Sequence, residues 1–215
     1  MTATAGDEDK PAPARPDRLA RLMDVGEQAI FVIALAFFYY ANIRAHDPAS
    51  VMVVVNDAVT VFFILIRRRT SLVSRRPSDW AIALMGTLAG MLMRPGGGSP
   101  LIPQAAATIV VLDGFVIEIA AKLSLNRSFG IAAANRGVQA RWAYRIIRHP
   151  MYLGYLLIHG GYLLANPSLY NLCVSLVLWA CQFGRILREE AFLLGDPAYR
   201  AYAQKVRYRL VPLLF

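Results

Sequence analysis

Six apolar runs, separated by short segments rich in arginine, constrain the fold of this chain more than any other feature. The runs cover residues 25–43, 49–66, 80–93, 101–123, 153–165 and 168–183. The first two are close to the length of about 20 residues with which a helix crosses a bilayer. With 57% hydrophobic and 17% charged residues, the composition also departs from that of soluble domains. The sequence therefore predicts an all-α integral membrane protein with about six transmembrane helices.

The basic residues predict how these helices are oriented. If the chain crosses the bilayer at each run, 21 of the 23 Lys and Arg residues fall on one side, and only Arg44 and Arg94 fall on the other. Because positively charged loops remain in the cytoplasm, both termini are expected to be cytoplasmic. The formal net charge of +9 is then explained by topology rather than by nucleic-acid binding. Residues 1–24 are acidic and rich in proline at their start, which predicts a disordered cytoplasmic tail and no cleaved signal peptide.

A basic and aromatic motif opens the fifth run. It extends from Tyr144 to Gly154 and contains Arg148-His149-Pro150-x-Tyr152. Proline suits the first turn of a helix, since it has no amide hydrogen to leave unpaired, so a helix is expected to begin at Pro150. Arginine and histidine beside a helix N-terminus favour an anionic ligand. The alternative is a basic cluster that only fixes the orientation of the helix in the membrane.

A second charged segment follows the last two runs. Asn166-Pro167 is such a short link that these runs are expected to form a tight antiparallel helical hairpin. Beyond it, Arg185 and Glu189 are one helical turn apart and share a face. The charge count places this segment on the same side of the membrane as the Arg148 motif, so the two can build one site.

Together these motifs resemble a family of membrane methyltransferases typified by isoprenylcysteine carboxyl methyltransferase, with phosphatidylethanolamine N-methyltransferases as relatives. The resemblance covers roughly residues 123–215, whereas the N-terminal half matches only as generic spans. The matching residues are Tyr144-Arg145, Arg148-His149-Pro150-x-Tyr152-x-Gly154, Arg188-Glu189-Glu190, Leu193, Tyr199, Tyr202 and the segment from Arg207 to Pro212.

Beyond the tail at residues 1–24, this resemblance implies a division of the chain into two parts. Residues 25–123 would form the N-terminal transmembrane helices on the substrate side. Residues 124–215 would form a methyltransferase-like core that comprises a connecting loop, the helical hairpin and a cytoplasmic helix. In that family the core binds S-adenosylmethionine in a cytoplasm-facing pocket, and a lipophilic acceptor enters from the bilayer.

The resemblance also implies roles for individual residues. Arg188 and Glu189 would be catalytic. Arg188, with Arg148 as a second candidate, would hold an acceptor carboxylate, and Glu189 or Glu190 would attract the positive charge of the cofactor. Independently of the resemblance, Asn56 and Asp57 lie near the middle of the second run, where they would line a substrate cavity or form an inter-helix hydrogen bond. The cofactor-binding set would be Tyr144, Arg148, His149, Pro150, Tyr152, Gly154, Glu189 and Glu190.

Several functions fit this pattern. A carboxylate is the expected methyl acceptor, but the sequence departs from the family at Arg141-Trp-Ala-Tyr144 and Gly195-Asp-Pro, so a lipid amine or a thiol remains an alternative. An NADPH-dependent membrane sterol-type reductase also carries similar C-terminal motifs, although such chains usually have more spans. A non-enzymatic lipid-binding membrane protein is the third reading.

The remaining polar and small residues predict packing rather than chemistry. Glu118 and Lys122 are four residues apart, which predicts an ion pair at the membrane interface. Gly86 and Gly90 have the spacing of a close helix contact. His159 is expected to be a hydrogen-bonded packing residue. His46, His149 and His159 do not form a metal site, so no metal is expected.

Overall fold

The computed structural model describes residues 58–67, 76–129, 137–212 and 215, together with scattered positions between 22 and 40. Within these residues the regular structure is helical throughout, as predicted. The labelled elements are α3 (Pro77–Leu88), η1 (Ala89–Leu92), α4 (Gln104–Leu125), η2 (Asn126–Ser128), η3 (Trp142–Arg145), α5 (Pro150–Ala165), α6 (Leu169–Leu193) and α7 (Pro197–Lys205). Residues 58–66 form a further helix. The predicted tail at residues 1–21, as well as His46, Asn56 and Asp57, lie outside the described residues.

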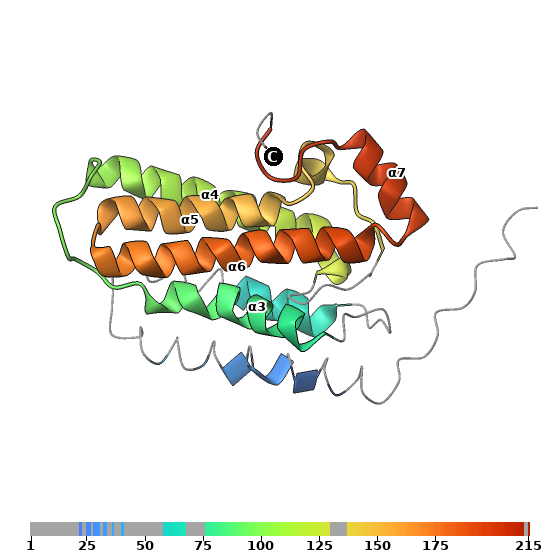
Figure 1. Ribbon diagram of the computed structural model, residues 1–215, viewed down its shortest axis with the longest axis horizontal. Helices are drawn as coiled ribbons and strands as arrows, with labels where there is room; N and C mark the ends of the chain where they lie inside the picture. Colours follow the sequence, from blue (N-terminus) through green and yellow to red (C-terminus); the bar gives the residue numbers. More distant parts are fainter. Residues whose placement is uncertain are drawn as a thin grey trace, which may run out of the picture.

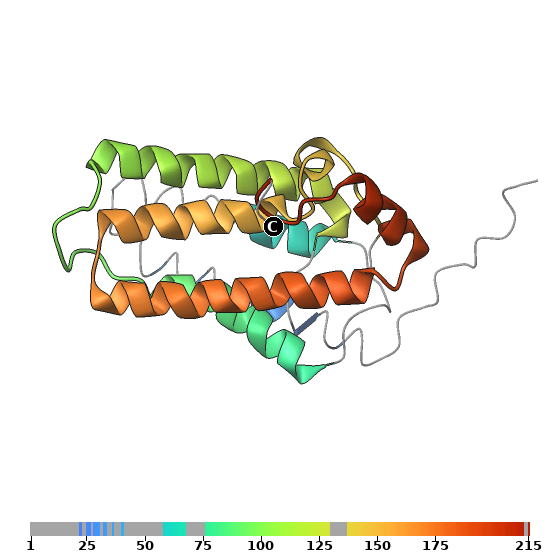
Figure 2. The ribbon, with the colours of Figure 1, turned by 45° about the horizontal axis from the view of Figure 1, so that its top comes forward.

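Helices α4, α5 and α6 lie side by side with their long axes roughly aligned, α3 lies against α6, and α7 lies across one end (Figure 1). Figure 2 shows the same bundle turned, with α4 beside α5 and α3 beside α6. Of the helices described, α6 is the one that is long and apolar enough to cross a membrane by length and composition.

The predicted hairpin is confirmed, because α5 ends at Ala165 and α6 begins at Leu169. Ser168 caps α6, and its hydroxyl accepts a hydrogen bond from the Asn171 amide at 3.0 Å. The second helix, however, does not end near residue 183 with its apolar run. It continues through the charged segment to Leu193, so Arg185, Glu189 and Glu190 are on the same rigid helix as the hairpin. Helical backbone bonding persists here because the segment has no glycine or proline after Gly184 to interrupt it.

Helices α4 and α5 approach closely because glycines face each other across the contact. A Cβ atom on Gly154 would lie 2.8 Å from the Gly114 carbonyl oxygen and 2.9 Å from Glu118 Cβ. A Cβ atom on Gly161 would likewise meet Val111. The predicted role of Gly86 in close packing is confirmed as well, since it packs against α6 beside Cys181 and Gln182.

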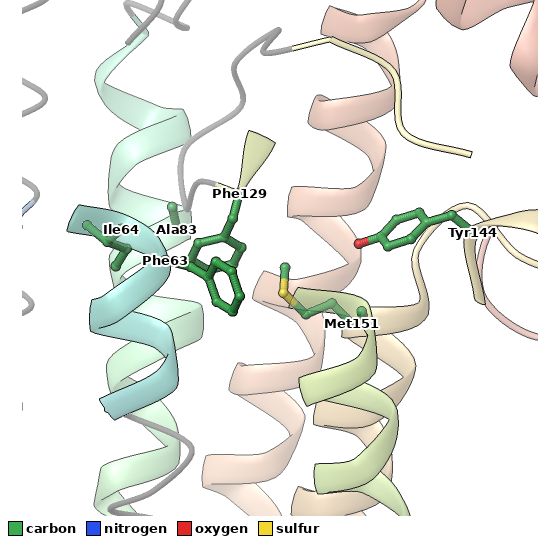
Figure 3. Close-up of a cluster of buried hydrophobic side chains, with 7 residues drawn as sticks. Phe63, Ile64, Ala83, Phe129, Tyr144 and Met151 are labelled. Carbon is green, nitrogen blue, oxygen red and sulfur yellow. The ribbon is translucent and has the colours of Figure 1, made fainter. Parts of the chain in front are cut away.

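The largest cluster of buried apolar side chains joins the helix of residues 58–66 to α3 and to the segments around η2 and η3 (Figure 3). Phe63 and Phe129 stack edge to face with ring centroids 6.5 Å apart. Tyr144 reaches this cluster from η3, and Met151 reaches it from the first turn of α5. The cluster therefore holds the motif at 144–154 against the rest of the bundle.

The predicted ion pair between Glu118 and Lys122 is present, and it is buried inside the bundle. Lys122 Nζ lies 2.5 Å from Glu118 Oε1, and the two side chains are 0% and 1% exposed. Lys122 also donates to Thr60 Oγ1 at 2.6 Å. The pair is buried because α5 and the helix of residues 58–66 cover the face of α4 on which both residues lie.

Candidate functional site

Glu190 is the centre of a buried polar network where α5 begins. Its Oε1 lies 2.8 Å from His149 Nε2 and accepts a hydrogen bond from the Tyr199 hydroxyl at 2.7 Å. Its Oε2 accepts a hydrogen bond from Arg148 and lies 3.6 Å from Arg209 Nε. Because a carboxylate only accepts hydrogen bonds, His149 Nε2 carries the hydrogen. The Glu190 side chain is 3% exposed, so its charge depends on these partners rather than on water.

The C-terminal segment is hydrogen-bonded directly to the Arg-His-Pro motif. The Arg148 amide donates to the Tyr208 carbonyl at 2.9 Å, and the His149 amide donates to the Arg209 carbonyl at 2.8 Å. Arg148 Nη2 also donates to the Arg207 carbonyl at 3.2 Å. This backbone contact holds the residues directly before α5, and His149 has a non-helical backbone (φ −129°, ψ 56°), since the ring of a following proline disfavours the helical conformation.

Two tyrosines of α7 fasten that helix to the motif. Tyr202 donates its hydroxyl hydrogen to the Tyr144 carbonyl at 2.7 Å. Burial, together with the hydrogen bond to the Glu190 carboxylate, raises the pKa of Tyr199 well above its ordinary value. Burial also raises the pKa of Tyr202. Both phenols therefore remain protonated donors throughout the physiological pH range.

A pocket lies beside this network, between the first turns of α3 and α5 and the last turns of α6. Its volume is about 10 Å³, enough for about one water molecule. This small cavity marks the place where side chains of the three helices meet, and it does not outline a larger ligand. The pocket is lined by Asp79, Ile82, Ala83, Tyr152, Arg185, Arg188 and Glu189.

Charges of both signs line the pocket. Tyr152 donates its hydroxyl hydrogen to Glu189 Oε2 at 2.9 Å, and the Arg185 guanidinium lies over the Tyr152 ring at 5.2 Å from its centroid. Arg188 Nη1 lies 2.5 Å from Asp79 Oδ1. A site of this kind offers a carboxylate to a cation and guanidinium groups to an anion within one small volume.

The sequence-predicted residues are brought together in two sets. Arg148, His149 and Glu190 form the buried network, whereas Tyr152, Arg188 and Glu189 line the pocket. The helix start predicted at Pro150 is confirmed. The remaining two predicted residues, Tyr144 and Gly154, contribute packing: Tyr144 is buried in the apolar cluster, and Gly154 faces α4. Whether any of these residues contacts a cofactor or an acceptor remains a prediction.

Sequence reasoning missed Asp79 as a residue of the pocket. Asp79 follows Pro77 in the first turn of α3, where an acidic residue is common because it complements the helix dipole. The helix dipole is thus enough to explain an aspartate at this position. Only the pairing of α3 with α6 brings Asp79 to the pocket. The GxxxG spacing of Gly86 and Gly90 was the sequence signal for a close helix contact at α3. This spacing does not identify the partner helix, which the structure shows to be α6 at Gly86.

Comparison with known proteins gives a family match and a structural likeness. Residues 104–198 match the model of the phospholipid methyltransferase family, which confirms the resemblance inferred from the motifs. The solved structure of the eukaryotic intramembrane Ras methyltransferase, isoprenylcysteine carboxyl methyltransferase, determined without a monobody, is 17% identical in sequence. The similarity covers 86% of this chain and 75% of that chain, with a TM-score of 0.47. No curated protein sequence gives a significant match.

Proposed function

We propose that this chain is an integral membrane methyltransferase that uses S-adenosylmethionine, because its residues 104–198 match the model of the phospholipid methyltransferase family. One observation carries the proposal. The matched region contains both the Arg-His-Pro-x-Tyr motif and the Arg-Glu-Glu segment, and Tyr152 of the first and Glu189 of the second share a hydrogen bond at the pocket.

The residues present fit such a cofactor by their chemistry. S-adenosylmethionine carries a sulfonium, an ammonium and a carboxylate, so its site needs both an anionic and a cationic partner. Glu189 supplies a carboxylate at the pocket. The buried Nε of Arg148 has no hydrogen-bond partner among the described residues, which leaves a donor for a carboxylate. In this proposal Glu189, Tyr152 and Arg148 contact the cofactor. Glu190 and His149, which bond to each other, keep the helix ends that carry these residues in place.

When bound, the cofactor supplies a methyl group that is already activated by its positive sulfur. The protein then has to position the acceptor and exclude water. Arg188 presents guanidinium donors at the pocket, where it would hold the carboxylate of a lipophilic acceptor. If the acceptor is an amine or a thiol instead, a base must take its proton, and Glu189 is the carboxylate placed to do so.

We further propose that the chain is a multi-pass protein with both termini in the cytoplasm. Arg94 lies at the end of the bundle where α5 turns into α6, since its amide donates to Asn171 Oδ1 at 3.0 Å. The pocket, α7 and the C-terminal segment lie at the opposite end (Figure 1). This arrangement agrees with the asymmetry of the basic residues, which assigns the pocket to the cytoplasmic side.

Ligand binding in detergent tests the proposed chemistry. S-adenosylhomocysteine at a hundred times its dissociation constant is expected to stabilise the native protein by about 2.7 kcal/mol, whereas NADPH is expected to have no effect. The measurement is a thermal unfolding curve with each ligand, supported by calorimetric titration. Substitution Glu189→Gln is expected to abolish the calorimetric signal. Stabilisation by NADPH alone would favour a sterol-type reductase, and binding of neither ligand would contradict an enzyme of this class.

A further inference from the structure

Arg188 is held by two acceptors that belong to a different helix. Its Nη1 donates to Ser78 Oγ at 2.8 Å and to Asp79 Oδ1 at 2.5 Å. Both acceptors are in the first turn of α3, 109 and 110 residues away in the sequence. A guanidinium is planar, so two acceptors on one nitrogen restrict the orientation of the entire group.

The position of Asp79 is itself fixed by contacts farther along α3. Gln182 Nε2 donates to the Gly86 carbonyl at 2.8 Å, and the Gly86 backbone packs against Cys181 and the Arg185 side chain. These contacts pin the middle of α3 to α6. The first turn of α3 therefore forms one wall of the pocket, to which it contributes Asp79, Ile82 and Ala83.

We propose that Asp79 is a positioning residue of the methyl-transfer site, which orients the Arg188 guanidinium for an acceptor carboxylate. Stability alone is a poor explanation for the Asp79–Arg188 contact. The Arg188 side chain is 39% exposed, so water screens its charge and weakens the contribution of the pair to folding, although the Asp79 side chain is only 9% exposed. The contact has a larger effect on the orientation of Arg188. Both contacts with α3 engage Nη1, so they fix the plane of the guanidinium and with it the directions of the Nη2 and Nε donors.

This inference rests on the proposed function and adds a determinant of acceptor specificity to it. Asp79 lies outside the family match, which begins at residue 104. Helix α3 is thus the part of the pocket in which this chain can differ from other members while it keeps the matched motifs. An acceptor with a carboxylate would bind between Arg188 and the methyl donor only if Asp79 leaves part of the guanidinium fork available.

The test is steady-state kinetics of the full-length protein in detergent, with S-adenosylmethionine and farnesylated N-acetylcysteine as the acceptor probe. Asp79→Ala is expected to lower kcat/KM for the probe by about tenfold to a hundredfold, as a misplaced positioning group does. The KM for S-adenosylmethionine is expected to remain unchanged. Asp79→Glu, which keeps the carboxylate, is expected to recover most of the activity. Asp113→Ala is the matched control, because Asp113 is an exposed aspartate on α4.

A charge-exchange variant separates positioning from simple bridging. Asp79→Arg combined with Arg188→Asp keeps an ion pair between α3 and α6 but removes the guanidinium from α6. This variant is expected to unfold at the wild-type temperature and to remain inactive. Restored activity would overturn the proposal, and so would a wild-type kcat/KM in Asp79→Ala. If the wild-type protein binds S-adenosylhomocysteine but does not methylate the probe, the proposed carboxylate acceptor is contradicted instead.

Discussion

Glu189 and Glu190 are neighbours in the sequence, but they face different surroundings on α6. Glu190 is enclosed by His149, Tyr199 and Arg148, and water does not reach it. Glu189 is only partly buried, and the one hydrogen bond described for its carboxylate comes from Tyr152. Adjacent helical residues point about 100° apart, which is why one carboxylate serves the interior and the other lines the pocket.

This difference predicts that the two glutamates fail in different ways when they are neutralised. Glu190→Gln is expected to lower the free energy of unfolding by about 3–5 kcal/mol, because it leaves Arg148 buried without its counter-charge. Glu189→Gln is expected to change stability much less, but to remove binding of S-adenosylhomocysteine. Denaturant titration in detergent measures the first effect and calorimetry the second. Equal destabilisation by both substitutions would contradict the division of roles.

At the scale of elements, the contact between α4 and α5 depends on glycines that leave room for backbone. Gly154 belongs to the motif that predicted a cofactor site, yet it faces Gly114 and Glu118 on α4. Its place in the motif is thus explained by packing, since a larger residue would push α5 away from α4, which carries the buried Glu118–Lys122 pair.

Substitution Gly154→Ala tests this explanation. The added Cβ would come within 2.9 Å of Glu118 Cβ, so the helices must shift, and we expect a loss of about 1–3 kcal/mol in the free energy of unfolding. Gly160→Ala on the same helix is the control. Nothing lies within 4 Å of a Cβ there, and alanine favours helix by about 1 kcal/mol over glycine. Thermal unfolding in detergent compares the two. A Gly154→Ala protein as stable as Gly160→Ala would show that the glycine is not needed for packing.

At the scale of the whole molecule, the described bundle has two chemically different ends. One end carries Arg94 and the turn between α5 and α6, where Asn171 bonds to both Arg94 and Asn166. The other end carries α7, which lies beside the last turn of α6 (Figure 2). The pocket and most of the described basic residues lie at this end as well. If the bundle spans a membrane, this difference determines which compartment supplies the cofactor.

Labelling of single cysteines tests that orientation. In a variant with Cys173 and Cys181 replaced by serine, a cysteine is introduced at exposed Ser99 or at exposed Lys205. In sealed vesicles with the cytoplasmic face outward, an impermeant maleimide is expected to label position 205 directly. Basic loops remain in the cytoplasm, and the segment that contains Ser99 has Arg94 as its single basic residue, so it is expected on the opposite side. Position 99 is therefore expected to react only after detergent is added. Direct labelling of both positions would contradict the predicted topology.

Features that depend on interactions between residues close in the sequence could be predicted, whereas those that depend on contacts between distant segments could not. The helices of the C-terminal half, the hairpin at Asn166-Pro167 and the start at Pro150 were predictable, since apolar run length and proline geometry act locally. The continuation of α6 to Leu193 was underestimated, because a change from apolar to charged residues ends an apolar run but not a helix. The burial of Glu118 and Lys122 depends on neighbouring helices that spacing on one helix cannot reveal.

The sequence alone thus predicted the helical class, the resemblance to membrane methyltransferases and the residues Arg148, His149, Tyr152 and Glu189 as those of interest. Only the tertiary structure decided how they are divided, with His149 and Arg148 joined to Glu190 in a buried network and Tyr152 joined to Glu189 at the pocket. It alone also brought Asp79 of α3 to Arg188. The physical reason is that propensity and charge asymmetry act along the chain, whereas an ion pair across 109 residues exists only once the helices have packed.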